Sequence, residues 1–583
     1  MKQRCVAFAL LLAGCFAIFL LQGKKASVSI TPRPLLYLLA DSQRDVERIP
    51  LALTRVSDQE EQKVGDQIAR DDGLSPSPAL SPEAATITAY LNAVGLRVAL
   101  HARRKAIRYR FYLRDDPYFF NAYALPGGYV VVGRGLLEWI ASEDELAAVL
   151  GHEIAHVDDR HSIARLQYEL ASRKLGLGDL YALGAPAVDL FKAGYAKDQE
   201  LEADRDGLGF AVAAGYSPVG ALDLMKRFEK LESDYSEHAA SPIGEFAEVP
   251  FSALVEYFRS HPPAAERLAM LQREIGANGW NTGRPVRPFE IRPIFLTDAA
   301  ERLNRSGDFR ESLAKLKQAI AINPNYTRAW QALGDASWRS GDALATVHAE
   351  SNVVRQSGAT DHDWQLLARG LAVSDPDRAV QRLEQILANH VGTEVSAPSS
   401  VPSIDLDGMR FLRGDERAAA DFEASLSSVK DVSAQADARC EMAWWMYRAG
   451  QPQAAEQQLE QARQMLPQSS PAAVYLVWVL TDLGRQADAE QMLASVAGGQ
   501  YSRGQSAELA AERAVLKWRT DQRDQAKQDF QAAARDDPVW MSAAWVQNSH
   551  SPSAAKVLMQ LEAFESARRA KASHRQIAAR YSP

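Results

Sequence analysis

The segment Gly151–His156 contains three residues whose types and spacing suit metal-assisted hydrolysis. His152 and His156 are four positions apart, so on a helix they share one face and both imidazoles can reach one metal ion. Glu153 follows the first histidine, where its carboxylate can act on a water molecule at that metal. Because this HExxH pattern also arises by chance, the prediction of a metal site depends on what the rest of the chain supplies.

The third ligand is expected from a second helix, within the segment Gln199–Gly207. A catalytic zinc ion takes three protein ligands and keeps a fourth position open. Glu200 and Asp204 share a helix face, whereas Glu202 points elsewhere. We therefore expect Glu200 to be the third ligand and Asp204 to hold a ligand histidine by its other ring nitrogen. The predicted cofactor is one zinc ion per chain; without the HExxH motif, a solvated acidic face would be the better interpretation.

These two segments, HEIAH at 152–156 and ELEAD at 200–204, resemble the HExxH…ExxAD pattern of the gluzincin metalloproteases. That family includes the CAAX prenyl protease, the heat-shock protease HtpX and the Oma-type peptidases. Three further segments resemble family motifs in the family's order. They are Asn121–Tyr129, the pair Arg160 and His161, and the run Ser260–Pro263 with Arg267. The resemblance covers roughly residues 55–275 and implies a zincin-type domain with peptidase activity.

His261 is a further candidate for the active site. Pro262 and Pro263 restrict the backbone beyond it and so fix where its imidazole points. The imidazole could stabilise the oxyanion of the reaction, or it could occupy the fourth zinc position. Arg267 is the other candidate for stabilising the oxyanion, and its alternative position is behind the zinc ligands. The alternative is an exposed loop histidine. His161 falls off the metal face, and we expect it to be a structural partner.

Helices are expected to position these residues. Ser142 and Glu145 form a capping-box pattern ahead of an apolar run, which predicts the start of the metal-binding helix. Ser57 and Glu60 form the same pattern, and residues 83–99 have the amphipathic spacing of another helix. The metal-binding residues are therefore expected on a largely helical scaffold.

Two strands are predicted before the metal-binding helix, at 108–113 and 122–132, the second interrupted by a Pro-Gly-Gly turn. A peptide substrate can lie extended beside a strand edge and pair with it through backbone hydrogen bonds. We expect the second strand to provide this edge, although an ordinary core strand is the alternative. The residues expected to bind substrate there are Gly128, Tyr129, Val130 and Val131. Residues 175–196, between the two metal helices, have the apolar composition of a buried helix pair or a lid.

The N-terminus has the pattern of an export signal. Lys2 and Arg4 precede an apolar run from Val6 to Leu21, so residues 1–25 are expected to be a signal peptide or an uncleaved inner-membrane anchor. A lipid attached to Cys15 is a third alternative. Each of them places the protein in the periplasm or cell envelope, either soluble or tethered by this segment.

The composition indicates a folded protein without a nucleic-acid partner. Hydrophobic residues make up 46% of the 583 residues and charged residues 24%, which are ordinary values for folded protein. The formal net charge is −8, and no basic run has the pattern of a nucleic-acid site. After the N-terminal segment no apolar run approaches the ~20 residues of a spanning helix, so membrane contact is expected only through the N-terminus.

The second half of the chain repeats with the tetratricopeptide period. Gly307 and Gly341 are 34 residues apart, as are Gly450 and Gly484, and 34 is the length of this helix-turn-helix unit. We expect five to seven helix pairs, stacked into a superhelix whose inner face binds protein segments. A tetratricopeptide-like second half resembles the domain arrangement of the periplasmic members of the family, which enhance β-barrel assembly.

The expected fold is mostly α: an α+β zincin-type metalloprotease domain with a small β-sheet, followed by an all-α tetratricopeptide-repeat superhelix. The expected divisions are the export segment 1–25, an irregular arm 26–55, the zinc metallopeptidase domain 56–275, a linker 276–293 and the repeat domain 294–583.

The expected function is that of an exported zinc endopeptidase with a protein-binding repeat domain. Its partners would be peptide substrates and, as the resemblance implies, proteins of envelope or outer-membrane assembly or quality control. The alternative is an assembly chaperone or scaffold whose peptidase is latent, and a narrow exopeptidase is a second rival. The presence of Glu153, the expected general base, argues against a pure pseudoenzyme.

Overall fold

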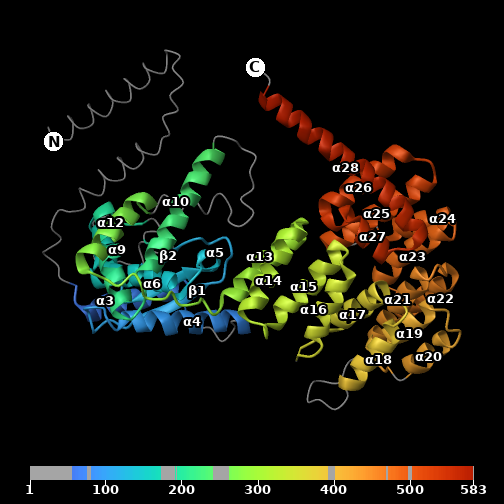
Figure 1. Ribbon diagram of the computed structural model, residues 1–583, viewed down its shortest axis with the longest axis horizontal. Coiled ribbons are helices and arrows are strands. Elements are labelled where there is room, and N and C mark those ends of the chain that lie inside the picture. Colours follow the sequence, from blue (N-terminus) through green and yellow to red (C-terminus); the bar gives the residue numbers. More distant parts are fainter. Residues whose placement is uncertain are drawn as a thin grey trace. The chain divides into compact units, whose positions relative to one another are not determined.

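The computed structural model describes residues 56–74, 81–172, 191, 194–239, 261–356, 358–390, 401–427, 429–467, 470–496 and 502–581. These residues divide into two compact units, the first drawn mainly in blue and green and the second mainly in yellow to red in Figure 1. Within the described ranges no helix is both long and apolar enough to cross a membrane. The expectations for residues 1–55, Cys15 included, and for nearly all of 175–196 lie outside the described residues.

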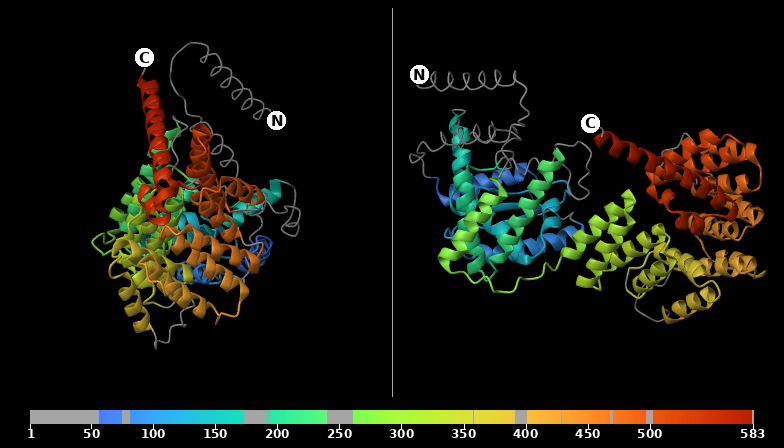
Figure 2. Two further views of the ribbon diagram at one scale, coloured as in Figure 1. Left: turned by 90° about the vertical axis from the view of Figure 1, so that its right-hand side faces the viewer. Right: turned by 45° about the horizontal axis from the view of Figure 1, so that its top comes forward.

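The first unit combines a small sheet with seven helices among its described residues (Figures 1 and 2). Its strands are β1 (Arg110–Arg114), β2 (Ala122–Leu125) and β3 (Tyr129–Gly133). Its helices are α3 (Asp58–Asp71), α4 (Pro82–Ala99), α6 (Glu143–Asp158), α7 (His161–Ser172), α9 (Lys197–Ala213), α10 (Val219–Ala239) and α12 (Ala264–Asn278). The expected mostly helical fold with a small β-sheet is confirmed.

The helix starts follow the capping signals of the sequence. At the start of α3, the Ser57 hydroxyl accepts from the Glu60 amide at 3.3 Å, while the Glu60 carboxylate accepts from the Ser57 amide at 2.8 Å. Two of the free amides at this helix end are thereby satisfied. Helix α6 begins at Glu143, directly after the predicted cap Ser142. The metal-binding helix therefore starts where the sequence predicts.

The order of strands in the sheet is β1-β3-β2. Strand β3 pairs in parallel with β1 and antiparallel with β2, so the single interrupted strand expected at 122–132 is a hairpin. Gly127 and Gly128 make its turn at φ values of 78° and 89°, which side chains other than glycine rarely adopt. Because β3 is the central strand, both of its backbone edges are occupied by its neighbours. The expectation that Gly128, Tyr129, Val130 and Val131 present a free edge to substrate is therefore wrong, and β2 is an outer strand instead.

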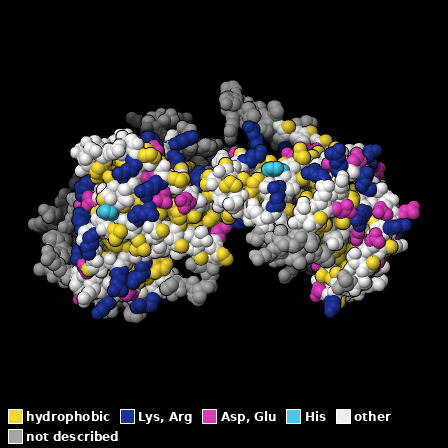
Figure 3. Space-filling model, turned by 60° about the horizontal axis from the view of Figure 1, so that its bottom comes forward, with side chains coloured by type: hydrophobic (Ala, Val, Ile, Leu, Met, Phe, Trp, Pro, Cys, Tyr) yellow, Lys and Arg dark blue, Asp and Glu magenta, His cyan; other side chains and the backbone are white. Residues whose placement is uncertain are grey.

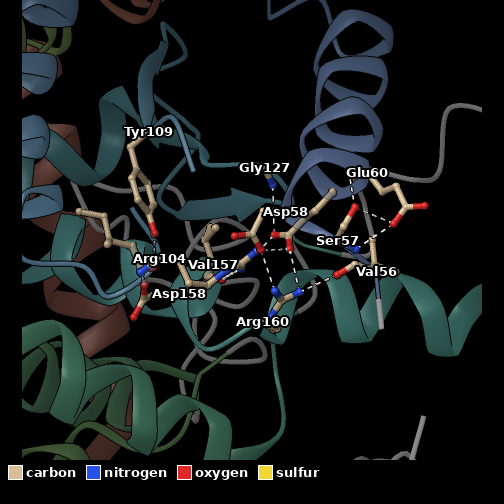
Figure 4. Close-up of polar contacts among 12 residues, drawn as sticks. Val56, Ser57, Asp58, Glu60, Arg104, Tyr109, Gly127, Val157, Asp158 and Arg160 are labelled. Carbon is tan, nitrogen blue, oxygen red and sulfur yellow. Dashed lines mark hydrogen bonds and ion pairs between the residues drawn. The ribbon is translucent and has the colours of Figure 1, made fainter. Parts of the chain in front are cut away.

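A buried charge network ties the end of α6 to the hairpin turn (Figure 4). Arg104 pairs with Asp58 at 2.7 Å and Glu61 at 2.6 Å, and it donates to the carbonyl of Val157 in the last turn of α6 at 2.6 Å. Glu61 is fully buried and also accepts from the Gly127 amide at 3.3 Å. One ion pair thus connects α3, the hairpin turn and the metal-binding helix.

The second unit is an array of antiparallel helix pairs. Its helices are α5 (Arg134–Trp139), α13 (Arg292–Ser306), α14 (Phe309–Ile322), α15 (Thr327–Ser340), α16 (Ala343–Val353), α17 (Asp361–Ser374), α18 (Ala379–His390), α19 (Val401–Leu412), α20 (Ala418–Leu426), α21 (Val432–Arg448), α22 (Pro452–Met465), α23 (Ser470–Asp482), α24 (Gln486–Val496), α25 (Arg503–Arg519), α26 (Arg523–Asp536), the 3-10 helix η3 (Pro538–Met541), α27 (Ala543–Ser549) and α28 (Pro552–Tyr581). The helices from α13 to α26 form seven consecutive pairs, which agrees with the expected five to seven.

The glycines that set the 34-residue period end helices. Gly307 ends α13 at a φ of 85° and Gly341 ends α15 at a φ of 87°, both in the left-handed region that glycine enters without strain. Gly450 and Gly484 have φ values of 73° and 74°. The spacing seen in the sequence is therefore the spacing of the turns inside successive helix pairs.

One segment that the sequence placed in the metallopeptidase domain folds with the second unit. Residues 134–143 belong there, where Arg134 pairs with Asp298 of α13 at 2.6 Å and Glu138 pairs with Arg302. Leu136 and Leu137 of α5 are also buried. The linker predicted at 276–293 therefore does not separate the two units completely, since α5 reaches the second unit from an earlier part of the chain.

We predict that Glu61→Ala lowers the free energy of unfolding of the first unit by about 3 kcal/mol, because it leaves the buried Arg104 with one carboxylate fewer. Urea unfolding measures the loss. As a control, Asp223→Ala breaks the exposed pair between Asp223 and Lys226 and should cost less than about 1 kcal/mol. Equal losses in the two variants would contradict the role assigned to the Glu61 network.

Candidate metal centre

Two glycines let the helices of the site approach each other. Gly151 of α6 and Gly207 of α9 face each other so closely that a Cβ added to either would overlap the backbone of the other. At this contact α6 and α9 present to each other the faces that carry the two motifs. The sequence contained this signal, a glycine next to each motif, but its meaning emerges only in the fold.

The predicted ligand atoms converge next to this crossing. The Nε2 atoms of His152 and His156 are 3.1 Å apart. The carboxylate of Glu200 lies 3.5 Å from the first of them and 3.7 Å from the second. All three side chains are buried. The structure therefore brings the three expected ligands to one point.

His261 lies in the same cluster. Its Nε2 is 3.8 Å from Oε2 of Glu200, and one donor atom from each of His152, Glu200 and His261 fits within 4.8 Å. Only 9% of His261 is exposed, which excludes the alternative of an exposed loop histidine. His261 therefore lies close enough to Glu200 and His152 to share a metal ion with them.

The donor set fits a zinc ion. Oε2 of Glu200 is buried and has no hydrogen-bond partner among the described residues, although it faces two imidazoles. A buried carboxylate oxygen without a donor is costly, and a cation between it and the ring nitrogens removes that cost. Imidazole nitrogens with one carboxylate oxygen are ligands that zinc takes in catalytic sites.

A buried ion pair orients the first ligand. Oδ1 of Asp204 lies 2.8 Å from Nδ1 of His152, so the predicted contact is present. Arg267 donates to both carboxylate oxygens of Asp204, at 2.7 and 2.6 Å. Burial disfavours the charged form of Asp204, but the guanidinium outweighs it and holds the pKa of the carboxyl well below its usual range. Because Asp204 engages Arg267 in this way, we assign Arg267 to the layer behind the ligands and not to the oxyanion.

His161 and Tyr195 contact the second ligand, His156. Nδ1 of His161 lies 3.1 Å from Nδ1 of His156, and Nε2 of His161 lies 3.4 Å from the half-exposed Glu202. His161 therefore acts as the structural partner that its helical phase predicts. Tyr195, which sequence reasoning missed, stacks on the His156 ring with centroids 3.9 Å apart. Its backbone amide donates to Glu200 at 3.1 Å, so Tyr195 fixes two of the three expected ligands.

Glu153 lines a small cavity beside these ligands. The cavity wall also includes His261, Tyr195 and the residues Asn121–Tyr123 at the start of β2. Burial raises the pKa of Glu153 to about 7, and this rise exceeds the opposing effect of His152. A carboxyl group with a pKa near neutrality can both accept and return a proton, which is what general base catalysis requires.

Comparison with known proteins agrees with this geometry. Residues 86–275 match the family model described as Peptidase family M48, and residues 446–503 match a tetratricopeptide repeat model. The chain therefore joins a segment similar to peptidase family M48 to a segment similar to tetratricopeptide repeats, which are the two similarities that the sequence predicts. This match supports the expected class of the first domain, a zinc metallopeptidase.

Three relatives illustrate the similarity. The beta-barrel assembly-enhancing protease of Escherichia coli (strain K12) is 28% identical over 200 residues, which are 31% of this chain and 38% of that protein. Mitochondrial metalloendopeptidase OMA1 of Arabidopsis thaliana is 30% identical over 157 residues, 26% of this chain and 28% of that protein. Metalloprotease LoiP of Escherichia coli (strain K12) is 24% identical over 237 residues, 38% of this chain and 84% of that protein. The matches to the beta-barrel assembly-enhancing proteases span only 34% to 38% of their length.

We predict that Glu200→Ala lowers both the zinc content and the peptidase activity of the purified protein, because it removes a donor that the structure places 3.5 and 3.7 Å from the two imidazoles. Glu202→Ala, on the same helix, should leave both nearly unchanged, since Glu202 reaches only His161 at this site. Metal analysis by plasma mass spectrometry separates the two variants. The opposite pattern would mean that the assignment of faces on α9 is wrong.

We predict that His261→Ala keeps its zinc and raises the turnover of casein, because the fourth ligand position then becomes open to water. If His261 stabilises the oxyanion instead, turnover should fall by about 10²-fold with zinc still bound. Adding Glu153→Gln to His261→Ala serves as the inactive control. Turnover equal to that of the unchanged protein would exclude both roles.

Proposed function

We propose that this chain, a peptidase family M48 domain joined to a tetratricopeptide region, is an exported zinc endopeptidase that acts in the assembly or quality control of outer-membrane proteins. The observation that carries the peptidase assignment is the convergence of His152, His156 and Glu200, with Glu153 in the wall of the adjoining cavity.

A zinc ion held by these residues would supply a water molecule with its pKa lowered to about 7 and would polarise the substrate carbonyl. Glu153 would accept a proton from the attacking water and return it to the leaving amine. The pairing of Asp204 with Nδ1 of His152 leaves Nε2 free to bind metal. Arg267 keeps Asp204 ionised for this task.

Strand β2 is the better candidate for the edge that binds the substrate backbone. It is an outer strand of the described sheet, and Ala122 and Tyr123 line the same cavity as Glu153. An extended substrate beside it would pair through backbone hydrogen bonds. The hydroxyl of Tyr195 donates to the carbonyl of Ala124 at 3.3 Å, so a bound strand would have to displace this contact.

The cellular role is proposed from the names of the relatives and from the N-terminus. Two of the relatives named above for E. coli and A. thaliana are a beta-barrel assembly-enhancing protease and a mitochondrial metalloendopeptidase. Residues 1–25 have the charge and apolar pattern of an export segment. The helix pairs of the second unit would bind client proteins in the periplasm or at the envelope.

A second candidate function is an assembly chaperone whose peptidase is latent. The position of His261 favours it, because a fourth protein ligand closes a zinc site in the way that structural sites are closed. In that case the main function would be the binding of client proteins by the second unit. The peptidase would act only after His261 moves away from the cluster of donor atoms.

We predict that Glu153→Gln retains zinc and loses peptidase activity by about 10²–10⁴-fold, since glutamine fills the same space but cannot accept a proton. The experiment measures zinc content and cleavage of casein by the purified full chain. Glu229→Gln, the same chemical change at an exposed position of α10, is the matched control and should keep its activity. Retained turnover in Glu153→Gln would remove this residue from the mechanism.

A further inference from the structure

The second unit contains a cavity of about 370 Å³, a size typical of ligand sites. Its walls come mainly from α15, α17, α21, α23 and α25, each the first helix of its pair, and from the segment of η3 and α27. It therefore lies on the inner side of the helix array, where tetratricopeptide superhelices bind other chains.

The cavity is enclosed because residues near the end of the helix array contact residues near its beginning. Arg339 of α15 pairs with Asp537, 198 positions further along the chain, at 2.7 Å. The side chain of Asn548 donates to the carbonyl of Gly341 at 3.4 Å. These contacts hold η3 and α27 across the opening of the array and make the cavity a pocket with fixed walls.

Aromatic rings form much of the pocket lining. Trp478 lies with its ring centroid 4.9 Å from that of His550, and the rings of Trp540 and Trp545 are 5.1 Å apart. The faces of such rings carry partial negative charge and attract cations. The wall already shows this behaviour, since the guanidinium of Arg369 lies 4.2 Å above the ring of Trp444.

The charges of the pocket do not balance. Arg369 is neutralised by Glu441 at 2.7 Å and Arg339 by Asp537, whereas the carboxylate of Glu508 forms no ion pair with any described residue. Burial raises the pKa of Glu508 to about 7, as expected for a carboxylate that lacks a counter-charge. A cation beside Glu508 would favour its ionised form, so the pocket has one carboxylate without a counter-charge to offer to a ligand.

One hydrogen-bonding group in the pocket is unsatisfied. The hydroxyl of Ser549 is buried and has no hydrogen-bond partner among the described residues, whereas the indole of Trp478 faces Glu508 and the hydroxyl of Tyr447 faces Ser551. A buried hydroxyl without a partner is costly, so the ligand is expected to bring a polar group as well as a positive charge.

The face of the second unit shown in Figure 3 carries charges of both signs. Dark blue Lys and Arg side chains lie among magenta Asp and Glu side chains there. A basic ligand would meet both signs of charge on this face, whereas the pocket offers it one carboxylate without a counter-charge.

We propose that this pocket binds a lysine or arginine side chain carried by an extended protein segment, with Glu508 as the counter-charge and the tryptophan rings as its apolar walls. A backbone carbonyl of the segment accepts from the hydroxyl of Ser549. This inference names the partner chemistry of the client-binding role proposed above. Binding is independent of the peptidase reaction, so either proposal can fail without the other.

The test measures binding of short blocked peptides to the full chain carrying Glu153→Gln, by the change in tryptophan fluorescence. The peptides are alanine heptamers with lysine, norleucine or phenylalanine at the centre. We expect the lysine peptide to bind about tenfold more tightly than the norleucine peptide. Glu508→Gln should abolish this difference, while Glu490→Gln, the same change at an exposed position, should preserve it.

Thermal unfolding of Glu508→Gln checks that the fold is kept, and Glu508→Asp, which retracts the carboxylate by one methylene, carries the test if it is not. Equal binding of the lysine and norleucine peptides would overturn the proposal, as would a preference for lysine that survives in a folded Glu508→Gln protein. Tightest binding of the phenylalanine peptide would show an apolar pocket instead. Binding of no peptide would reduce the pocket to a cavity of the core.

Discussion

The contact between Gly151 and Gly207 is the constraint on which the site depends. Side chains larger than hydrogen at these positions would push α6 and α9 apart, and the two imidazoles would then lose the carboxylate of Glu200. Interhelical distances in proteins are normally set by interlocking side chains. Here backbone meets backbone, so donor atoms on short side chains from two helices reach the same point.

Burial is the second constraint on the site, because a buried carboxyl group stays ionised only where a group of opposite charge lies beside it. Asp204 stays ionised next to Arg267, while Glu153, which lacks such a partner, has its pKa raised to about 7. The two carboxylates therefore have different roles in one site: Asp204 orients a histidine, and Glu153 exchanges a proton. The second unit shows the same contrast, since Glu441 is paired with an arginine and Glu508 is not.

Much of the fold and of the metal centre could be predicted from the spacing of residues within single helices, whereas features that depend on contacts between distant segments could not. The face shared by His152 and His156, the contact from Asp204 and the 34-residue turns all depend on helical geometry over a few residues, which a sequence contains. The central position of β3 depends on its partner strands, and alternation within one strand says nothing about them. The packing of α5 in the second unit could not be predicted for a similar reason. The apolar residues of α5 indicate that it is buried, but they do not indicate which other helix it packs against. Tyr195 carried no motif at all.

The most direct test of the account is the position of zinc in a crystal of the full chain, located by its anomalous scattering. We expect one peak per chain within about 2.0–2.2 Å of Nε2 of His152, Nε2 of His156 and a carboxylate oxygen of Glu200. A fourth contact to His261 would identify the closed form of the site. A zinc peak at any other place, or no peak in active protein, would contradict the assignment of the metal centre and the peptidase mechanism derived from it.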